Sequence, residues 1–308
     1  MKIYNLKWLS ILLLLFTSVL TFAQKKSNGF YGKVKYCKTI TMNAKSQFGQ
    51  VVTLDTTGIS ERTYEVNGDD VGSRSWTPTL ETVTIFELSA DGKKQYGQKF
   101  SNSVLESEYW YNDKGLMVRL RSTYQTGALK GKTSDVRYAY NDFGKHLADT
   151  SYNEYGEMKH LTTYEYNKDS LLTVRTTYTA NGSVLSLTKY YYDDNNREEM
   201  TAESLSYSDN KNYTKTEYDE EGRKKTFSRI SSNSANEYSY HYLDFGHDEY
   251  TTMFHKSTTK TSQTYTQTDY KYVYDDHGNW VKKIIYNVNM GNDLRNATSV
   301  QVRQIEYF

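Results

Sequence analysis

The chain has 308 residues, of which 31 are tyrosine and only one is proline, and its formal net charge is +1. A nearly neutral chain has no general attraction for nucleic acid, so we exclude nucleic acid as a predicted partner. A single cysteine, Cys37, excludes an internal disulfide. Hydrophobic residues make up 37% of the chain, below the usual ~45–50%, which predicts a thin core to which tyrosine contributes much of the packing.

Residues 1–23 have the three-part layout of a secretory signal peptide. Lys2 and Lys7 give a positive start, an apolar run follows over 9–20, and Ala23 offers a small residue for cleavage. An uncleaved membrane anchor is the alternative, but the run is shorter than the ~20 residues that span a bilayer. We therefore predict a secreted chain without a membrane-spanning helix, located in the periplasm, at the cell surface or outside the cell.

Residues 24–84 are predicted to form an irregular β cap, which would protect the first edge of a strand array from pairing with other chains. Within it, 33–40 reads as a strand that contains Cys37. A half-buried structural thiol is the preferred interpretation of Cys37. A reactive nucleophile is the alternative, but no His or Asp partner motif accompanies it.

One pattern recurs over 85–308: an aromatic residue, any residue, tyrosine, three turn-forming residues and glycine. It reads YWYNDKG, YAYNDFG, YHYLDFG and YVYDDHG, and degenerate copies and half-repeats lie between these. The second tyrosines are Tyr111, Tyr140, Tyr166, Tyr192, Tyr218, Tyr242 and Tyr274. The predicted turn glycines are Gly115, Gly144, Gly156, Gly182, Gly222, Gly246 and Gly278.

Each copy predicts a strand, a short turn and a second strand. The two tyrosines of a copy are two residues apart, so they lie on the same face of a strand. Asn, Asp and Gly then favour a tight turn. The chain is therefore predicted to be all-β, an antiparallel meander of about 16–20 strands that forms an extended or curled sheet.

The acidic stretch Asp275-Asp276-His277-Gly278 reads as one of these turns and not as a catalytic or metal site. Its first residue aligns with Asn112 in an earlier copy, and a turn tolerates Asn in place of Asp whereas a general acid would not. His277 has no counterpart in the other copies.

Two segments, TEYDEEGRKK at 216–225 and YVYDDHGNWVKK at 272–283, resemble the YD repeats of Rhs-type bacterial proteins. The motif of that family is Tyr-Asp-x-x-Gly followed by Arg or Asn. The resemblance implies a long sheet that can spiral into a shell around a toxin, and repeats often described as carbohydrate-binding. This chain is too short for such a shell, and we see neither a self-cleaving core segment nor a C-terminal toxin domain.

Other candidates for chemistry are sparse. His241, Asp244 and His247 have metal-like spacing, but a predicted turn separates the two histidines, so no metal and no cofactor are expected. We find no nucleophile elbow or phosphate-binding loop. The chain is therefore expected to be no enzyme and to have no catalytic residues. A glycan-active enzyme with converging carboxylates is the alternative.

Aromatic side chains are the candidate ligand-binding residues, because rings stack on sugar faces and tyrosine hydroxyls form hydrogen bonds. The candidates are Trp110, Tyr111, Tyr140, Tyr166, Tyr192, Tyr218, Tyr242, Tyr274 and Trp280. The alternative is that these rings only stack on one another as the core of a thin sheet.

An outer-membrane β-barrel is a further alternative, since the chain is predicted to be all-β and ends in Phe308. Counting back by twos from Phe308 places Glu306 and Gln304 on the face that lipid would contact, which disfavours it. The sequence therefore predicts a secreted, non-enzymatic protein that binds a polysaccharide or an envelope or surface protein. A purely structural or shielding sheet, or an orphan fragment of an Rhs-type toxin system, is the alternative.

Overall fold

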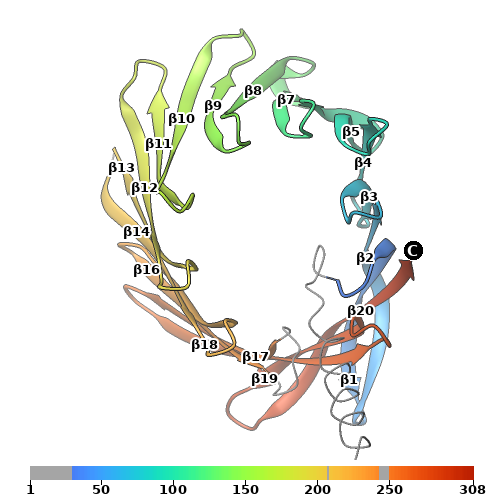
Figure 1. Cartoon of the computed structure of the whole chain (residues 1–308). Helices are drawn as coiled ribbons and strands as arrows, with labels where there is room; N and C mark the ends of the chain where they lie inside the picture. Colours follow the sequence, from blue (N-terminus) through green and yellow to red (C-terminus); the bar gives the residue numbers. More distant parts are fainter. Residues whose placement is uncertain (1–29, 207, 243–249) are drawn as a thin grey trace, which may run out of the picture.

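The protein is a closed barrel of antiparallel strands. The computed structural model describes residues 30–206, 208–242 and 250–308, in which 20 strands form one sheet that makes a ring when viewed end-on (Figure 1). The first ten strands are β1 Val34–Gln47, β2 Gln50–Tyr64, β3 Asp70–Trp76, β4 Glu81–Leu88, β5 Lys94–Ser101, β6 Val104–Tyr111, β7 Met117–Thr123, β8 Thr133–Tyr140, β9 His146–Tyr152 and β10 Met158–Tyr166. The last ten are β11 Leu172–Thr179, β12 Val184–Tyr192, β13 Glu198–Leu205, β14 Ser208–Tyr218, β15 Lys224–Ile230, β16 Ser234–Tyr242, β17 Tyr250–Thr259, β18 Gln263–Tyr274, β19 Trp280–Asn289 and β20 Leu294–Tyr307.

Each strand pairs with the next one along the chain, which confirms the predicted all-β antiparallel meander. The final strand, β20, then pairs with β1 from Val34–Tyr307 to Asn43–Ser299 and closes the ring. This closure shows that the resemblance to YD-repeat, Rhs-type proteins is wrong for this chain. A sheet whose first and last strands pair is a complete barrel, so it is not a spiral shell or a fragment of one.

The predicted segments map onto the barrel as follows. The signal peptide expected at 1–23 lies outside the described residues. The part of the expected cap that is described, from residue 30 to 84, contains β1 to β3 and the start of β4, all in the same sheet. A short 3-10 turn, η2 (Gly127–Leu129), lies between β7 and β8. Among the described residues, no helix is long and apolar enough to cross a membrane.

The described turns after the repeated tyrosines lie at one end of the barrel, because each joins an even-numbered strand to the next odd-numbered one in a simple meander. In the six of these turns that the structure describes, the Asn or Asp side chain accepts hydrogen bonds from the backbone. Asp275 Oδ1, for example, accepts from His277 N at 3.0 Å and Asn279 N at 2.9 Å. Gly278 has a φ of +85°, a backbone conformation that residues with a Cβ rarely adopt. Positive φ also occurs at Gly115, Gly144, Gly156, Gly182 and Gly222, whereas Gly246 lies outside the described residues.

Alternation along the strands divides the wall into two surfaces. We call the surface that carries the repeated tyrosines the tyrosine face, and the other the opposite face. In β12, Tyr190 and Tyr192 belong to the tyrosine face, whereas Lys189 and Tyr191 belong to the opposite face.

The second tyrosines connect neighbouring hairpins. In five of the seven, the hydroxyl donates a hydrogen bond to the carbonyl of the second residue after the turn of the preceding repeat, at 2.8–2.9 Å. The pairs are Tyr140 with Met117, Tyr166 with His146, Tyr192 with Leu172, Tyr218 with Glu198, and Tyr242 with Lys224. We call these five bonds the tyrosine ladder. Each joins one hairpin to the preceding hairpin, which gives the repeated tyrosine a structural role.

Replacing Tyr192 with phenylalanine is expected to lower the free energy of unfolding by about 1 kcal/mol, because the Leu172 carbonyl loses its hydroxyl donor. Urea unfolding of residues 24–308 would measure it. Tyr191→Phe is the matched control, since this neighbouring ring lies on the opposite face and is 39% exposed. Equal effects at both positions would contradict the ladder.

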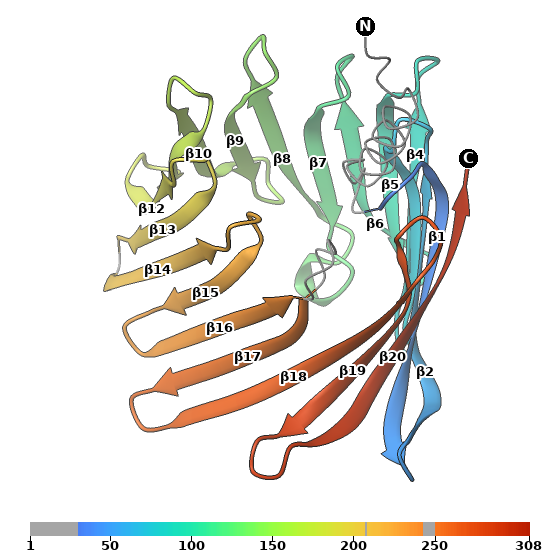
Figure 2. The same cartoon turned by 60° about the horizontal axis from the view of Figure 1, so that its bottom comes forward.

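The apolar core is concentrated at the seam where the ring closes. One buried cluster joins Phe30, Val34, Cys37 and Tyr64. A second joins Ala44, Ala297 and Val300, with Met42, Val51, Ile284, Tyr286 and Val302 packed against it. These clusters lie in β1, β2, β19 and β20 and in the segment before β1, strands that run side by side in Figure 2. Elsewhere the buried residues of the wall are mostly hydroxyl-bearing, such as Thr176, Thr188 and Thr216.

The last repeat turn also holds the seam. Asn279 is 3% exposed. Its side-chain oxygen Oδ1 accepts a hydrogen bond from Tyr31 N at 2.7 Å, and its Nδ2 donates one to Tyr31 O at 2.7 Å. The same amide donates to the Tyr307 hydroxyl at 2.7 Å, and that hydroxyl donates to Asp275 at 2.5 Å. Burial, and then the bond to Asp275, raises the pKa of the Tyr307 phenol. The His277 ring stacks on Tyr307 with centroids 3.9 Å apart. The stretch 275–279 therefore binds both the segment that precedes β1, through Tyr31, and the last strand β20, through Tyr307.

Candidate functional site

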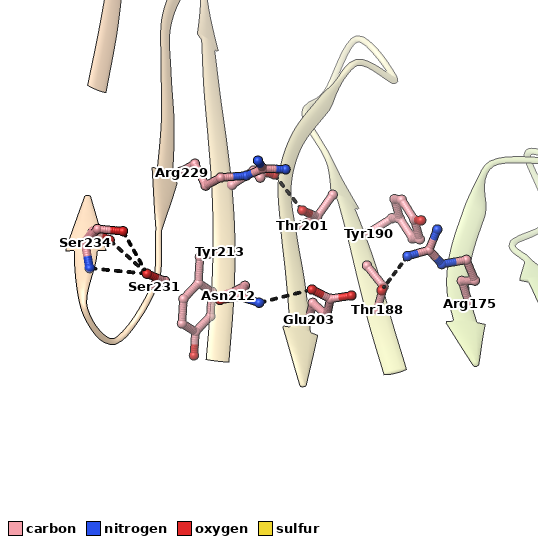
Figure 3. Close-up of a pocket in the computed structure, with 11 residues that line it drawn as sticks. Arg175, Thr188, Tyr190, Thr201, Glu203, Asn212, Tyr213, Arg229, Ser231 and Ser234 are labelled. Carbon is pink, nitrogen blue, oxygen red and sulfur yellow. Dashed lines mark hydrogen bonds between the residues drawn. The ribbon is translucent and has the colours of Figure 1, made fainter. Parts of the chain in front are cut away.

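The candidate site is a polar cavity on the tyrosine face, between β11 and β16. Its volume is about 400 Å³, within the range of ~300–1,000 Å³ that is usual for ligand pockets. The lining residues are Arg175, Thr188, Tyr190, Thr201, Glu203, Asn212, Tyr213, Thr214, Arg229, Ser231 and Ser234. Figure 3 shows their side chains spread across neighbouring strands, with Arg175 at one side and the two serines at the other.

Strand register arranges these residues in two rows across the sheet. In the first row, Arg175 is opposite Thr188, Thr188 is opposite Glu203, and Glu203 is opposite Asn212. The second row starts at Tyr190, which is opposite Thr201. It continues through Thr214 to Arg229. Directly opposed side chains on one face are close enough to interact, so each row is a continuous strip of polar groups.

Hydrogen bonds within the rows hold the side chains in place (Figure 3). Arg175 Nη2 donates to Thr188 Oγ1 at 3.3 Å, and Asn212 Nδ2 donates to Glu203 Oε2 at 3.1 Å. The Thr201 and Thr214 hydroxyls are 2.6 Å apart. Ser231, in the turn before β16, and Ser234, the first residue of β16, close one side through a bond of 3.1 Å between their hydroxyls. The cavity therefore presents ordered donors and acceptors beside the Tyr190 ring.

The charges of the site are two guanidinium groups and one carboxylate. Glu203 is the only acid among the lining residues. General acid/base hydrolysis of a glycan needs two carboxyl groups ~5–9.5 Å apart. Among the described residues, no group of three His, Cys, Asp or Glu side chains could hold a metal ion. The arrangement is therefore chemically suited to binding through hydrogen bonds and guanidinium groups.

None of the nine predicted aromatic residues lines this cavity. Tyr140, Tyr166, Tyr192, Tyr218 and Tyr242 belong to the tyrosine ladder. Burial raises the pKa of Tyr111 to about 12, and the Tyr274 ring lies 5.9 Å from that of Tyr272. Their role in ligand binding stays a prediction.

The two predicted tryptophans lie on different parts of the wall. Trp280 is 9% exposed, and the Arg303 guanidinium covers it 3.4 Å from the ring centroid. Trp110 is half-buried on the opposite face of β6, between the Tyr96 ring at 5.5 Å and the Arg119 guanidinium at 4.9 Å. Neither residue reaches the cavity.

The remaining predicted features have simple surroundings. Cys37 is buried and free in the seam. His241 packs edge-on against Phe254, with centroids 5.3 Å apart. Asp244 and His247 lie outside the described residues, so the expectation that these residues bind no metal stays a prediction.

Sequence reasoning missed the charged residues of the cavity. Arg175, Glu203 and Arg229 belong to no repeated motif, and they come together only because the strands pair in register. One signal was available. Tyr190 is the first tyrosine of the copy YYYDDNN, and its alternation with Thr188 places both on the tyrosine face.

Comparisons with known proteins identify no family. No family model matches the chain, and no curated protein matches it. A porin-like protein from Bacteroides uniformis is 12% identical, with a TM-score of 0.39, over 90% of this chain and 98% of that one. A porin-like protein from Bacteroides vulgatus is 10% identical, with a TM-score of 0.23, over 89% and 98%. The solved structure of TcdB2-TccC3-TEV is 15% identical, with a TM-score of 0.25, over 84% of this chain and 15% of that one. The function proposed below depends on the residues of the cavity instead.

Proposed function

We propose that this chain is a non-enzymatic binding protein of the bacterial envelope that holds a glycan in the cavity between β11 and β16. The observation that carries the proposal is the pair of cross-strand rows, which present hydroxyl, amide and guanidinium groups beside the Tyr190 ring. A sugar offers many hydroxyl groups and an apolar ring face, and aromatic rings with fixed polar groups recognise both. Export is supported by the predicted signal peptide at 1–23.

The same cavity supports binding in preference to catalysis. Only Glu203 among its lining residues carries a carboxylate, so an acid/base pair for glycoside hydrolysis is not assembled there. The backbone around it is regular β-sheet, which keeps the two rows in fixed positions. Side chains that are already held in place lose little further entropy when a ligand binds.

A structural or shielding role is the second candidate, and the tyrosine ladder favours it. Five of the repeated tyrosines use their hydroxyls to join hairpins within the barrel. A purely structural barrel would need these tyrosines and would not need the cavity. The two functions therefore differ in whether the cavity side chains matter for anything besides folding.

Tyr190→Ala is expected to weaken glycan binding, because it removes the ring beside the polar groups. A glycan array with folded residues 24–308 and a heat-unfolded control would first identify the ligands. The affinity of the variant would then be measured for those sugars, and a loss of about tenfold or more is expected. Tyr191→Ala is the matched control, since this neighbouring ring lies on the opposite face and should keep wild-type binding. Absence of binding to every sugar by the folded protein would leave the structural role as the better account.

A further inference from the structure

The charges of the cavity identify a class of ligand, and this inference rests on the proposed function. We infer that the cavity binds an acidic glycan, a chain of sugars that carry carboxylate groups. Arg175 and Arg229 are its cationic residues, and Glu203 lies between their strands.

The two arginines differ from most others in the barrel wall. Arg119, Arg197, Arg223 and Arg295 form ion pairs with aspartates at 2.7–2.9 Å. Neither Arg175 nor Arg229 has a carboxylate partner in the part of the chain that the structure describes, and Arg175 gives one bond to the Thr188 hydroxyl. A guanidinium has five donors in a planar fork that fits a carboxylate. Each arginine therefore keeps donors for an external acid.

The spacing of the two arginines favours a chain over a single sugar. Arg175 is on β11 and Arg229 is on β15. Neighbouring strands are ~4.8 Å apart, so four steps across the sheet separate these positions by roughly 19 Å. Figure 3 shows Thr201, Glu203 and Thr188 between the two guanidinium groups. A bound chain would place carboxylates at the two arginines, and its hydroxyls would donate to Glu203 and bond to the threonines.

The test compares one glycan with and without its charge. The probe is an oligogalacturonate of several sugars, and its fully methyl-esterified form keeps the backbone but removes the carboxylates. Calorimetry with folded residues 24–308 is expected to show binding of the acid form and binding about tenfold or more weaker for the ester, because charge-assisted hydrogen bonds are lost.

Variants then locate the contact. Arg175→Gln and Arg229→Gln are each expected to weaken binding of the acid by about tenfold. Arg137→Gln removes the same charge from the opposite face, where Arg137 is exposed and stacks over Tyr152 at 4.9 Å. It should retain wild-type affinity. Thermal unfolding followed by circular dichroism would show that each variant is folded.

Two outcomes would overturn the inference, and they differ in what else they imply. Equal affinity for the acid and the ester, with both cavity variants unchanged, would reject the acidic class while leaving glycan binding in place. An equal loss in Arg137→Gln would also reject it, because general charge attraction would then explain binding. If neither form binds and the array also finds no sugar, the proposed function fails together with the inference.

Discussion

Replacing Asn279 with alanine is expected to lower the free energy of unfolding by about 2–4 kcal/mol, the sum of three buried side-chain hydrogen bonds at roughly 1 kcal/mol each. Asn279 bonds to both backbone groups of Tyr31 and to the Tyr307 hydroxyl. Two of the earlier repeats have Arg197 and Arg223 at this position, where the guanidinium pairs with an aspartate of its own turn. Only the last repeat uses a short amide to bind the segment that precedes β1.

Urea unfolding of residues 24–308 would measure the effect of Asn279→Ala. Asn195→Ala is the control, because Asn195 is an exposed turn residue of an earlier repeat, where substitutions usually change stability by about 0.5 kcal/mol or less. Equal stability of the two variants would contradict a stabilising role of the Asn279 side chain at the seam.

Replacing Val300 with aspartate is expected to be the more damaging change, with a loss of about 4 kcal/mol or more, because it buries an unpaired charge. Val300 is 1% exposed and packs with Ala44 and Ala297 in the seam. It is opposite Met42 on β1 and Ile284 on β19, so the charge would separate β20 from both neighbours. Two unpaired edges would then be free to pair with other chains.

Val273→Asp is the matched control, since Val273 lies in β18 and is 49% exposed. The same substitution there should cost about 1 kcal/mol or less. Chemical unfolding and light scattering would compare stability and aggregation of the two variants. Similar behaviour would mean that the seam cluster is not what stabilises the barrel.

The hairpins and their turns could be predicted from the sequence because their determinants are local. Tyr274 and Asp275 lie next to one another, and the hydrogen bonds of the turn join residues two and four positions apart. The period of two within each strand also assigns Tyr190 and Tyr192 to one face. These features depend on neighbouring residues alone, so a pattern search detects them.

Closure of the barrel could not be predicted in this way, because it depends on residues at the two ends of the chain. The pattern at 33–40 predicts a strand, but it does not reveal that Ile40 of this strand is opposite Val302. The similarity of the turns to YD repeats reflects the local chemistry of tight turns, and it led to the wrong family. The cavity was missed for the same reason, since only the register of five strands places Arg175 and Arg229 in the lining of one cavity.

Disulfide trapping across the seam tests the closed barrel most directly. In a Cys37→Ala background, Lys38→Cys with Gln304→Cys and Thr41→Cys with Gln301→Cys are two opposed pairs on β1 and β20. They are three residues apart, so one pair is hydrogen-bonded and the other is not. The Cα spacings of both kinds of pair, ~5.5 and ~4.5 Å, fall within the range that a disulfide spans. Closure predicts that mild oxidation of the folded protein links the two chain ends in at least one pair, as mass spectrometry would show. It also predicts no link between Lys38→Cys and Asn195→Cys, a turn residue between β12 and β13. A folded protein that forms neither seam disulfide would contradict the barrel and indicate an open sheet.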